Sequence, residues 1–362
     1  MIDYFDIASV DNVEKKITSY TTYTFAEAPS RARKAIKKDN ILVSTVRPNL
    51  NAVALFDIET ENIPVASTGF CVLECKPDTF PPFLFNYLQS KSFVDEMVSQ
   101  ATGASYPAVN DKIVRSAHLP AYSYAEQVQI ANVLDRLARV ISKRKQQLQK
   151  LDELVKARFV EMFGDEGNPY NLPVVNIEDV ANVQVGVVIK PAQYYTDAGH
   201  GIRAFRSLNI GTMRVKNADW VYFSEEGNRK NQKSILKEND LLIVRSGAPG
   251  TACVVTKEYA GCNAVDIIIA RPDLKKVNPY YLCQYTNLSH GRKQIEEGTG
   301  GAAQQHFNVG KYNKIKLMLP PLDKQNMFER FVKQTDKSKV AIQKALDEAQ
   351  LLFDSLMQKY FG

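Results

Sequence analysis

The feature that most constrains this chain is a 40-residue apolar stripe that occurs twice, in residues 125–164 and 323–362. Apolar side chains alternate at steps of four and three, a spacing typical of a long helix packed against another helix. Both copies open near a glutamine, Gln127 or Gln325, and end in Phe-Gly, where glycine suits a helix C-cap. We predict that the pairing residues are Ile130, Leu134, Leu137, Ile141, Leu148, Leu151, Val155, Phe328, Val332, Ile342, Leu346, Phe353 and Leu356.

The segments before the two stripes also repeat, at an offset of about 200 residues. Compact apolar runs predict strands at Ile41–Ser44, Phe70–Leu73 and Val265–Ile269, with the 239–243 run matching 39–43. Helical spacing predicts one helix at Pro82–Gln100 and its repeat at Pro279–His290. The second unit has about thirty residues, 172–203, without a counterpart before Tyr4, so we expect the first unit to be incomplete at its N-terminus.

These repeats predict an α+β fold with two tandem α/β domains separated by two long, antiparallel coiled-coil helices. The predicted boundaries are 1–124 for the first domain, 125–164 for the first helix, 165–171 for a linker, 172–322 for the second domain and 323–362 for the second helix.

Each long helix has a seam too apolar to leave in water, and the other copy is the obvious partner. An antiparallel pair would relate the two halves by an approximate two-fold axis. At a rise of 1.5 Å per residue, each helix would be roughly 60 Å long, which corresponds to on the order of 17 base pairs of DNA. A spacer between domains and a dimerisation coil are the alternative roles for this pair.

The composition and the first residues indicate neither export nor a membrane span, and they do not select a function. The net charge of +6 permits a polyanionic partner without requiring one. Five cysteines without zinc-ligand or redox-pair spacing indicate reduced thiols, and we expect a cytoplasmic protein. Neither a signal peptide nor an apolar run long enough to span a membrane is present.

Catalytic motifs are weak or absent in the sequence. Asn168-Pro169-Tyr170 and Asn278-Pro279-Tyr280 resemble the Asn-Pro-Pro-Tyr element of amino-methyltransferases but lack the second proline, and no Gly-rich turn offers a place for S-adenosylmethionine. Clustered carboxylates of a nuclease and paired histidines of a zinc site are also missing. We therefore predict no catalytic residues, no metal site and no bound cofactor in this chain.

Polar and basic loops recur beside the predicted strands of both units. Arg, Lys, Asn and Gln are the side chains that contact DNA phosphates and base edges, although any single run of this kind is more often a solvated surface. The candidates for DNA contact are Arg31, Arg33, Lys34, Arg47, Asn49, Asn51, Arg203, Arg206, Asn209, Arg229, Lys230, Lys233, Arg245, Gln304 and Gln305.

Two variable units, each ending in Leu-Pro and followed by a glutamine and a long helix, resemble the specificity subunit of a Type I restriction-modification enzyme. The segment Leu319-Pro320-Pro321-Leu322-Asp323-Lys324-Gln325 is similar to that family's entry into its spacer helix. The first copy departs from the pattern, since Leu119-Pro120-Ala121-Tyr122 has two extra residues before Gln127.

This resemblance implies a non-catalytic adaptor in which each domain reads one half of a split DNA target. It implies that double-stranded DNA, two modification subunits and restriction subunits are the partners, with S-adenosylmethionine, ATP and Mg²⁺ bound by those subunits. The alternatives are a silent or truncated specificity allele and, less favoured, a stand-alone DNA methyltransferase or nuclease.

Overall fold

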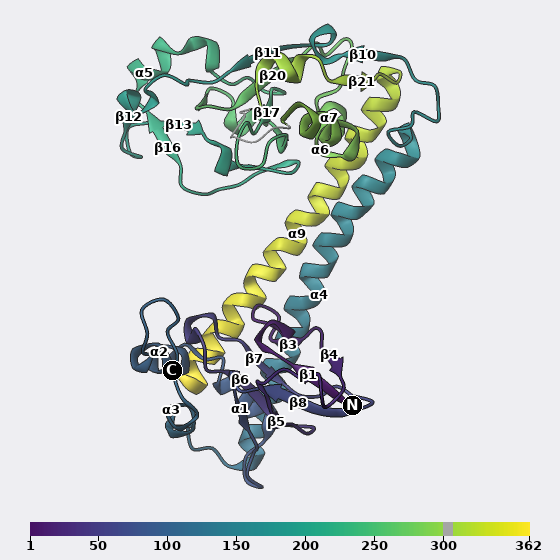
Figure 1. The fold of residues 1–362 in the computed structure, drawn as a ribbon. Helices are drawn as coiled ribbons and strands as arrows, with labels where there is room; N and C mark the ends of the chain where they lie inside the picture. Colours follow the sequence, from purple (N-terminus) through teal and green to yellow (C-terminus); the bar gives the residue numbers. More distant parts are fainter. Residues whose placement is uncertain (300–306) are drawn as a thin grey trace. The chain divides into compact units, whose positions relative to one another are not determined.

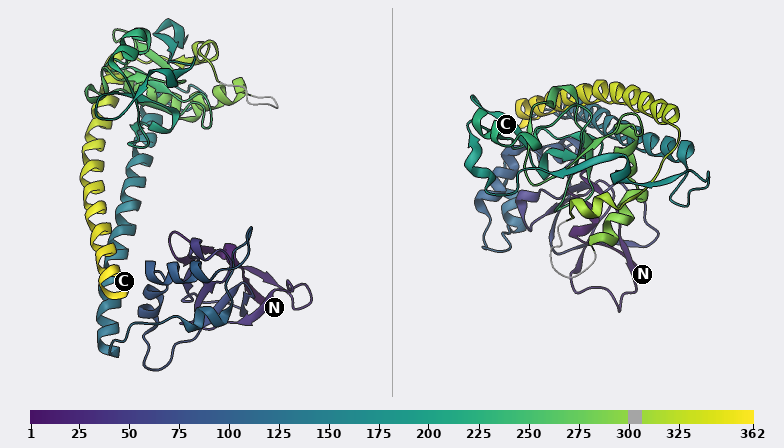
Figure 2. Two further views of the ribbon diagram at one scale, coloured as in Figure 1. Left: turned by 90° about the vertical axis from the view of Figure 1, so that its left-hand side faces the viewer. Right: turned by 90° about the horizontal axis from the view of Figure 1, so that it is seen from above.

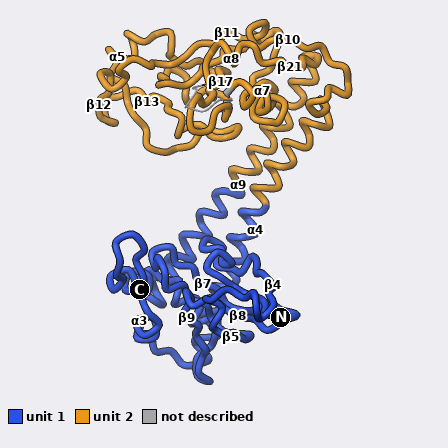
Figure 3. The backbone as a smooth tube through the Cα atoms, viewed as in Figure 1, with its two compact units in different colours: residues 1–146, 342–362 blue, residues 147–341 orange. Residues whose placement is uncertain are grey.

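The computed structural model describes residues 1–299 and 307–362. Its contacts divide the chain into two units, Met1–Gln146 with Ile342–Gly362, and Gln147–Ala341 (Figure 3). The chain contains two helices of 40 residues, α4 (Tyr124–Phe163) and α9 (Leu322–Phe361). Each of them is divided between the units, with one segment in unit 1 and the other in unit 2. The rest of each unit is a mixed domain of helices and short strands (Figure 1), which confirms the predicted fold class.

Unit 1 contains three small sheets and three short helices before α4. The sheets have strand orders β4-β1-β8-β5, β7-β6-β9 and β2-β3. The elements are β1 (Ile2–Phe5), β2 (Val10–Asp11), β3 (Lys16–Ile17), β4 (Thr21–Tyr23), β5 (Ala32–Ala35), β6 (Ile41–Ser44), β7 (Val53–Leu55), β8 (Ile63–Ser67), β9 (Phe70–Leu73), α1 (Pro81–Tyr87), α2 (Lys91–Gln100) and α3 (Asp111–Ser116).

Unit 2 repeats this plan with additional strands. Its sheets have the orders β11-β20-β17-β18, β12-β16-β13-β19, β10-β21 and β14-β15. The elements are β10 (Val174–Asn176), β11 (Ala181–Val185), β12 (Tyr195–Thr196), β13 (Ile202–Phe205), β14 (Ile210–Gly211), β15 (Arg214–Val215), β16 (Val221–Phe223), α5 (Glu225–Lys230), β17 (Leu241–Ile243), β18 (Ala252–Val254), β19 (Asn263–Ala264), β20 (Ile268–Pro272), α6 (Pro279–Asn287), α7 (Ser289–Thr299), α8 (Val309–Asn313) and β21 (Lys316–Met318).

The two units have the same pattern of strand pairing, which the similarity of their sequences suggested but did not establish. In each, one strand pairs with an antiparallel neighbour and a parallel one: β1 with β4 and β8, and β13 with β16 and β19. The strand β6 lies between β7 and β9 as β17 lies between β18 and β20. The strand β11 pairs along the outer edge of β20, whereas β9 is the last strand of its sheet in the described part of the chain.

In unit 1, the beginning of α4 and the end of α9 pack together against the domain. Ile130, Ala131 and Leu134 of α4 join Phe361 in one buried cluster with α1 and α2. The ring of Phe361 lies 5.2 Å from that of Phe83. Since the first turns of α4 meet the last turns of α9, the pairing in this unit is antiparallel, as predicted.

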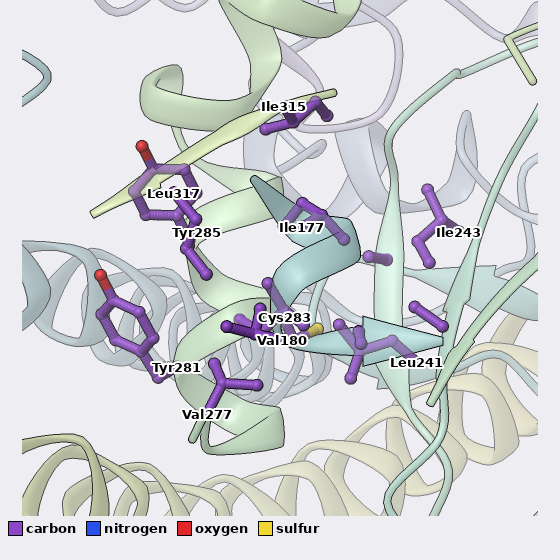
Figure 4. Close-up of a cluster of buried hydrophobic side chains, with 14 of the residues drawn as sticks. Ile177, Val180, Leu241, Ile243, Val277, Tyr281, Cys283, Tyr285, Ile315 and Leu317 are labelled. Atoms are coloured by element: carbon purple, nitrogen blue, oxygen red, sulfur yellow. The ribbon is translucent and has the colours of Figure 1, made fainter. Parts of the chain in front are cut away.

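In unit 2, the end of α4 packs against the beginning of α9, which is again an antiparallel arrangement (Figure 2). Phe159 and Phe163 contact Phe328 at ring distances of 5.3 and 5.8 Å, and Phe159 stacks on Tyr281 of α6. Figure 4 shows that Tyr281 and Tyr285 of α6 belong to a cluster with the buried strand residues of this unit. The long helices therefore contribute directly to the core of unit 2.

The predicted seam matches the burial of the two helices. Six of the thirteen predicted pairing residues are less than 10% exposed, and the other seven are half-buried. Lys339, which interrupts the seam, is only 22% exposed at its side chain, and its Nζ lies 2.7 Å from Asp152 Oδ1 on α4. The basic residue is accommodated because a carboxylate on the facing helix pairs with it.

A buried glutamine in each long helix anchors that helix to its domain with the same three contacts. Gln127 Oε1 accepts from Phe80 N, and its Nε2 donates to Asp78 O and Tyr122 O. Gln325 Oε1 accepts from Asn278 N, and its Nε2 donates to Lys276 O and Pro320 O. These are the two glutamines at which the sequence repeats begin.

Three predicted elements have different boundaries in the structure. The helix predicted at Pro82–Gln100 is two helices, because Ser90 is extended and caps α2 by accepting from Phe93 N. The helix predicted at Pro279–His290 likewise ends at Asn287, where Leu288 becomes extended. The strand predicted at Val265–Ile269 begins only at Ile268, because Asp266 has a left-handed backbone with φ 51°.

We predict that Gln325→Ala lowers the free energy of unfolding of unit 2 by on the order of 3 kcal/mol, because buried backbone groups lose their partners. Urea titration followed by the fluorescence of Trp220, the only tryptophan, would report on unit 2. Gln334→Ala, at an exposed position of the same helix, is the matched control and should change stability little. A loss below about 1 kcal/mol for Gln325→Ala would contradict the anchoring role.

His290 is a second buried polar contact to a long helix. It is 4% exposed, and its Nε2 lies 3.1 Å from Gly164 O, just after the end of α4. Among the residues that the structure describes, its Nδ1 has no hydrogen-bond partner. Burial lowers the pKa of His290 and outweighs the opposing effect of the hydrogen bonds to Gly164 and Asp165 and of the nearby carboxylates. Folding therefore favours the neutral imidazole of His290.

The lowered pKa of His290 predicts a pH dependence of stability. Near and below about pH 6.5 the imidazole is protonated more readily in the unfolded chain than in the folded chain, so unfolding becomes more favourable as the pH falls. Above that pH both states are neutral and the effect vanishes. The free energy of unfolding, measured between pH 5 and 7, should fall less steeply towards low pH in His290→Gln. Identical slopes would show that His290 does not contribute.

Candidate nucleic-acid interface

The first group of candidates in unit 1 lies on and beside β5. Arg31 and Arg33 are exposed. Lys34 is not available in the same way, since its Nζ lies 2.7 Å from Asp111 Oδ2 and donates to Phe70 O. Phe70 O lies on the edge of β9 that faces away from β6, and Val72 O on the same edge accepts from Arg115. We assign Lys34 a structural role.

The second group in unit 1 lies in the β6–β7 loop. Arg47 and Asn49 are exposed, and the guanidinium of Arg47 lies 4.7 Å from the ring centroid of Tyr106. Asn51 is half-buried, and its amide donates to Leu88 O while its Oδ1 accepts from Lys15. Asn51 therefore holds the loop in place, and Arg47 and Asn49 are the residues that face solvent.

In unit 2, Arg203 is the second residue of β13, and Arg206 directly follows that strand. Arg203 is exposed, and its guanidinium lies 5.4 Å from the ring of Trp220, which stacks on Tyr259. Arg206 is half-buried and donates to Asp219 O, and among the described residues its buried Nε has no hydrogen-bond partner. Arg203 therefore lies beside aromatic rings, and Arg206 is bonded to the residue that precedes Trp220.

Asn209 lies inside the protein. It is 0% exposed, its Oδ1 accepts from Arg206 N, and its amide donates to Ala218 O. The structure therefore places this DNA-contact candidate in the interior, where its amide fixes the turn that carries Arg206. Its role is to position Arg206.

The remaining candidates of unit 2 differ in how free their side chains are. Arg229 is exposed on α5, and Lys230 beside it pairs with Glu226 at 2.7 Å. Lys233 is exposed in the turn that follows. Arg245 is only 15% exposed at its side chain and binds Asp266 and Phe307 O, so it holds the chain together rather than facing solvent. Gln304 and Gln305 lie outside the described residues.

The charge of the two domains is unequal. Residues 1–123 contain 12 Lys and Arg against 14 Asp and Glu, whereas residues 165–321 contain 19 against 15. The domain of unit 2 therefore has a net charge of +4 and that of unit 1 has −2. A polyanion is attracted more strongly by unit 2.

The motifs that resembled a methyltransferase element have local structural roles. Asn278 is the N-cap of α6, accepts from Tyr280 N and donates to Asn326 and Glu329 of α9. Asn168 holds a loop by bonding Leu172 N and O. Within the described residues, no cluster of His, Cys, Asp or Glu could hold a metal ion, and no helix is long and apolar enough to cross a membrane.

Two aromatic residues were missed by the sequence analysis. Trp220 and Tyr106 each lie under an exposed arginine that was identified, Arg203 and Arg47. The arginines are distant from these rings in sequence, so periodicity and composition could not connect them. Trp220 is the only tryptophan in the sequence, and this was the one feature that could have drawn attention to it.

Comparison with known proteins identifies the family. The family described as Type I restriction modification DNA specificity domain matches residues 7–153 and again residues 156–350. The chain therefore belongs to this family and contains two copies of its domain. The two matches correspond to the internal repeat, and each includes one domain with a long helix following it.

Relatives and solved structures agree with this assignment. The chain is 20% identical over 98% of its length to the Type I restriction enzyme StySPI specificity subunit of Salmonella potsdam, covering 80% of that protein. It is 30% identical over 142 residues to the HindI specificity subunit of Haemophilus influenzae, which is 38% of this chain and 31% of that subunit.

Among solved structures, the S subunit of a Type I restriction-modification system from M. genitalium aligns with a TM-score of 0.59 at 15% identity, over 100% of this chain and 88% of that one. A chain from a study of complex assembly and conformational transition of the type I R-M system aligns with a TM-score of 0.58 at 22% identity, over 99% of this chain and 90% of that one. These two similarities show the shared fold.

Proposed function

We propose that this chain is the DNA sequence-recognition subunit of a Type I restriction-modification complex and reads a bipartite target. The observation that carries the proposal is the duplication: two specificity domains have the same strand pairings and the same glutamine anchor. A duplicated backbone with different surface residues is suited to reading two different DNA segments.

The corresponding turns after β1 and β13 illustrate the difference between the domains. In both turns the side chain of the last residue accepts from the backbone N–H of the first, Ser9 from Asp6 N and Asn209 from Arg206 N. The backbone N–H of the last residue also donates to the carbonyl of the first in both turns. Only Asp6 accepts at its side chain as well, from Ser9 N. The equivalent position therefore presents an exposed carboxylate in one unit and a guanidinium in the other. A carboxylate accepts from the amino group of cytosine, whereas arginine donates to guanine, so the two half-sites are expected to differ.

The long helices are proposed to hold the partner subunits. Val133 and Val140 on α4 are 42% and 43% exposed and lie seven residues apart on one face, outside the seam with α9. Leu154 and Val160 are exposed on the segment of α4 in unit 2. Apolar side chains in this arrangement suit contact with another helix.

The chemistry of the complex is proposed to belong to its other subunits. Two modification subunits would bind S-adenosylmethionine and methylate adenine, and restriction subunits would use ATP and Mg²⁺. This chain would supply target recognition without catalysing either reaction.

The test is expression of the chain with modification subunits, followed by sequencing of methylated DNA and competition binding at physiological salt. We expect co-purification with the modification subunits and methylation at a split motif. Equal binding of motif-bearing and random duplexes would refute sequence recognition. Failure to co-purify would favour a silent allele, and methyl transfer by this chain alone would favour a methyltransferase.

Two arginines of unit 2 should have distinguishable effects in that complex. Arg206→Ala should change which sequences are methylated, because Arg206 projects from a turn fixed by Asn209. Arg229→Ala should weaken binding to all sequences and reduce the salt dependence by about one phosphate contact, because Arg229 is exposed on the surface of the more basic domain. Equal effects of both substitutions on specificity would contradict these roles.

A further inference from the structure

The β6–β7 loop of unit 1 contains two residues with left-handed backbone conformations, Arg47 with φ 50° and Asn51 with φ 46°. Asparagine tolerates this conformation, but a long side chain such as arginine rarely adopts it because Cβ approaches the backbone. Residues kept in such conformations cluster at functional sites. Arg47 therefore calls for an explanation that Asn51 does not.

The equivalent loop of unit 2, between β17 and β18, uses glycine at both places. Gly247 and Gly250 each have φ 83°. The pairs Val43↔Val53 and Ile243↔Ala252 show that this loop is one residue shorter, so Arg47 corresponds to Gly247 and Asn51 to Gly250. The backbone course requires a left-handed residue at this position in both units, and only unit 1 places a side chain there.

The loop of unit 1 is held firmly at both ends. Arg47 N donates to Pro107 O at 2.7 Å, and Val109 N donates to Thr45 O at 2.9 Å. At the other end, the amide of Asn51 donates to Leu88 O at 3.0 Å. The Arg47 side chain therefore projects from a fixed base, which reduces the ordering that binding would require.

The side chain of Arg47 is supported by an aromatic ring and remains accessible. Its guanidinium lies 4.7 Å from the ring centroid of Tyr106, and Tyr106 is 67% exposed. In residues 1–299 and 307–362, no carboxylate forms an ion pair with Arg47. A guanidinium that stacks on a ring keeps its N–H groups free at the edge of the plane.

We propose that Arg47, oriented by Tyr106, reads a guanine in the half-site of unit 1, and that unit 2 makes no such contact because glycine occupies the equivalent position. The fork of an arginine matches the O6 and N7 acceptors of guanine in the major groove. This inference rests on the proposed function, and it assigns to one residue the kind of base that it recognises.

The experiment uses the complex with modification subunits and duplexes that carry its methylated motif, with each base pair of the motif varied in turn. Arg47→Gly removes the side chain and supplies the residue that unit 2 has, so folding should be retained. Discrimination at one G·C pair of one half-site should fall about ten-fold or more, with the other half-site unchanged. Undiminished discrimination at every position would overturn the proposal.

Further variants separate base reading from charge. Arg47→Lys keeps the charge and loses the two-pronged geometry, so it should lose discrimination at the same base pair. Lys38→Ala, at an exposed lysine of unit 1 that is not among the candidates for DNA contact, should leave discrimination at that pair intact. Tyr106→Ala should weaken discrimination there, whereas Tyr106→Phe should not. Full discrimination in Arg47→Lys, or its loss in Lys38→Ala, would show that charge alone acts.

The result also distinguishes this inference from the proposed function. If the wild-type complex shows no preference among the duplexes, the proposed function fails. If it has a clear motif and Arg47→Gly leaves that motif unchanged, sequence recognition holds and only the assignment to Arg47 fails.

Discussion

Each domain depends on a buried glutamine that joins it to a long helix. Gln127 and Gln325 are 5% and 0% exposed, and each bonds one backbone N–H and two backbone carbonyls of its own unit. The amide accepts and donates at once, which no apolar side chain can do, and the backbone groups that it binds would otherwise be buried without partners. The contact fixes where the helix begins relative to α1 or α6.

With the helix and backbone fixed in this way, loops can change without altering the domain. The turn after β1 and that after β13 share the same backbone hydrogen bond and the same side-chain bond to the first backbone N–H, yet one carries Asp6 and the other Arg206. The β6–β7 loop and the β17–β18 loop have left-handed residues at equivalent positions, yet the first carries Arg47 where the second carries Gly247. In both cases a local backbone constraint is satisfied by different residues, which leaves the outward-facing side chain free to differ between the half-sites.

Much of this architecture could be predicted from the sequence, because it depends on periodicity. The seam residues of α4 and α9 follow the spacing of a helix. The strands β6 and β17 are compact apolar runs at equivalent positions. The break at Ser90 and the turn at Asp266 were not predicted, since they depend on a cap and on a left-handed residue that apolar spacing does not reveal. Among the candidates for DNA contact, type and position alone could not separate Asn209, which is buried, from Arg229, which is exposed.

Lys34 and Arg115 show why a basic residue near a strand is an ambiguous signal. In unit 2, Ile267 O accepts from Gly186 N, just after β11, and β11 pairs with β20. In unit 1 the corresponding carbonyls on the edge of β9 are Phe70 O and Val72 O, and the side chains of Lys34 and Arg115 donate to them. A strand edge needs donors for its outward carbonyls, and charged side chains at such an edge also discourage pairing with other chains. Lysine and arginine can bind phosphate, but here they donate to carbonyls that a neighbouring strand would otherwise bind. Only the hydrogen-bond partners show whether a given lysine or arginine is free for phosphate or bonded to a strand edge.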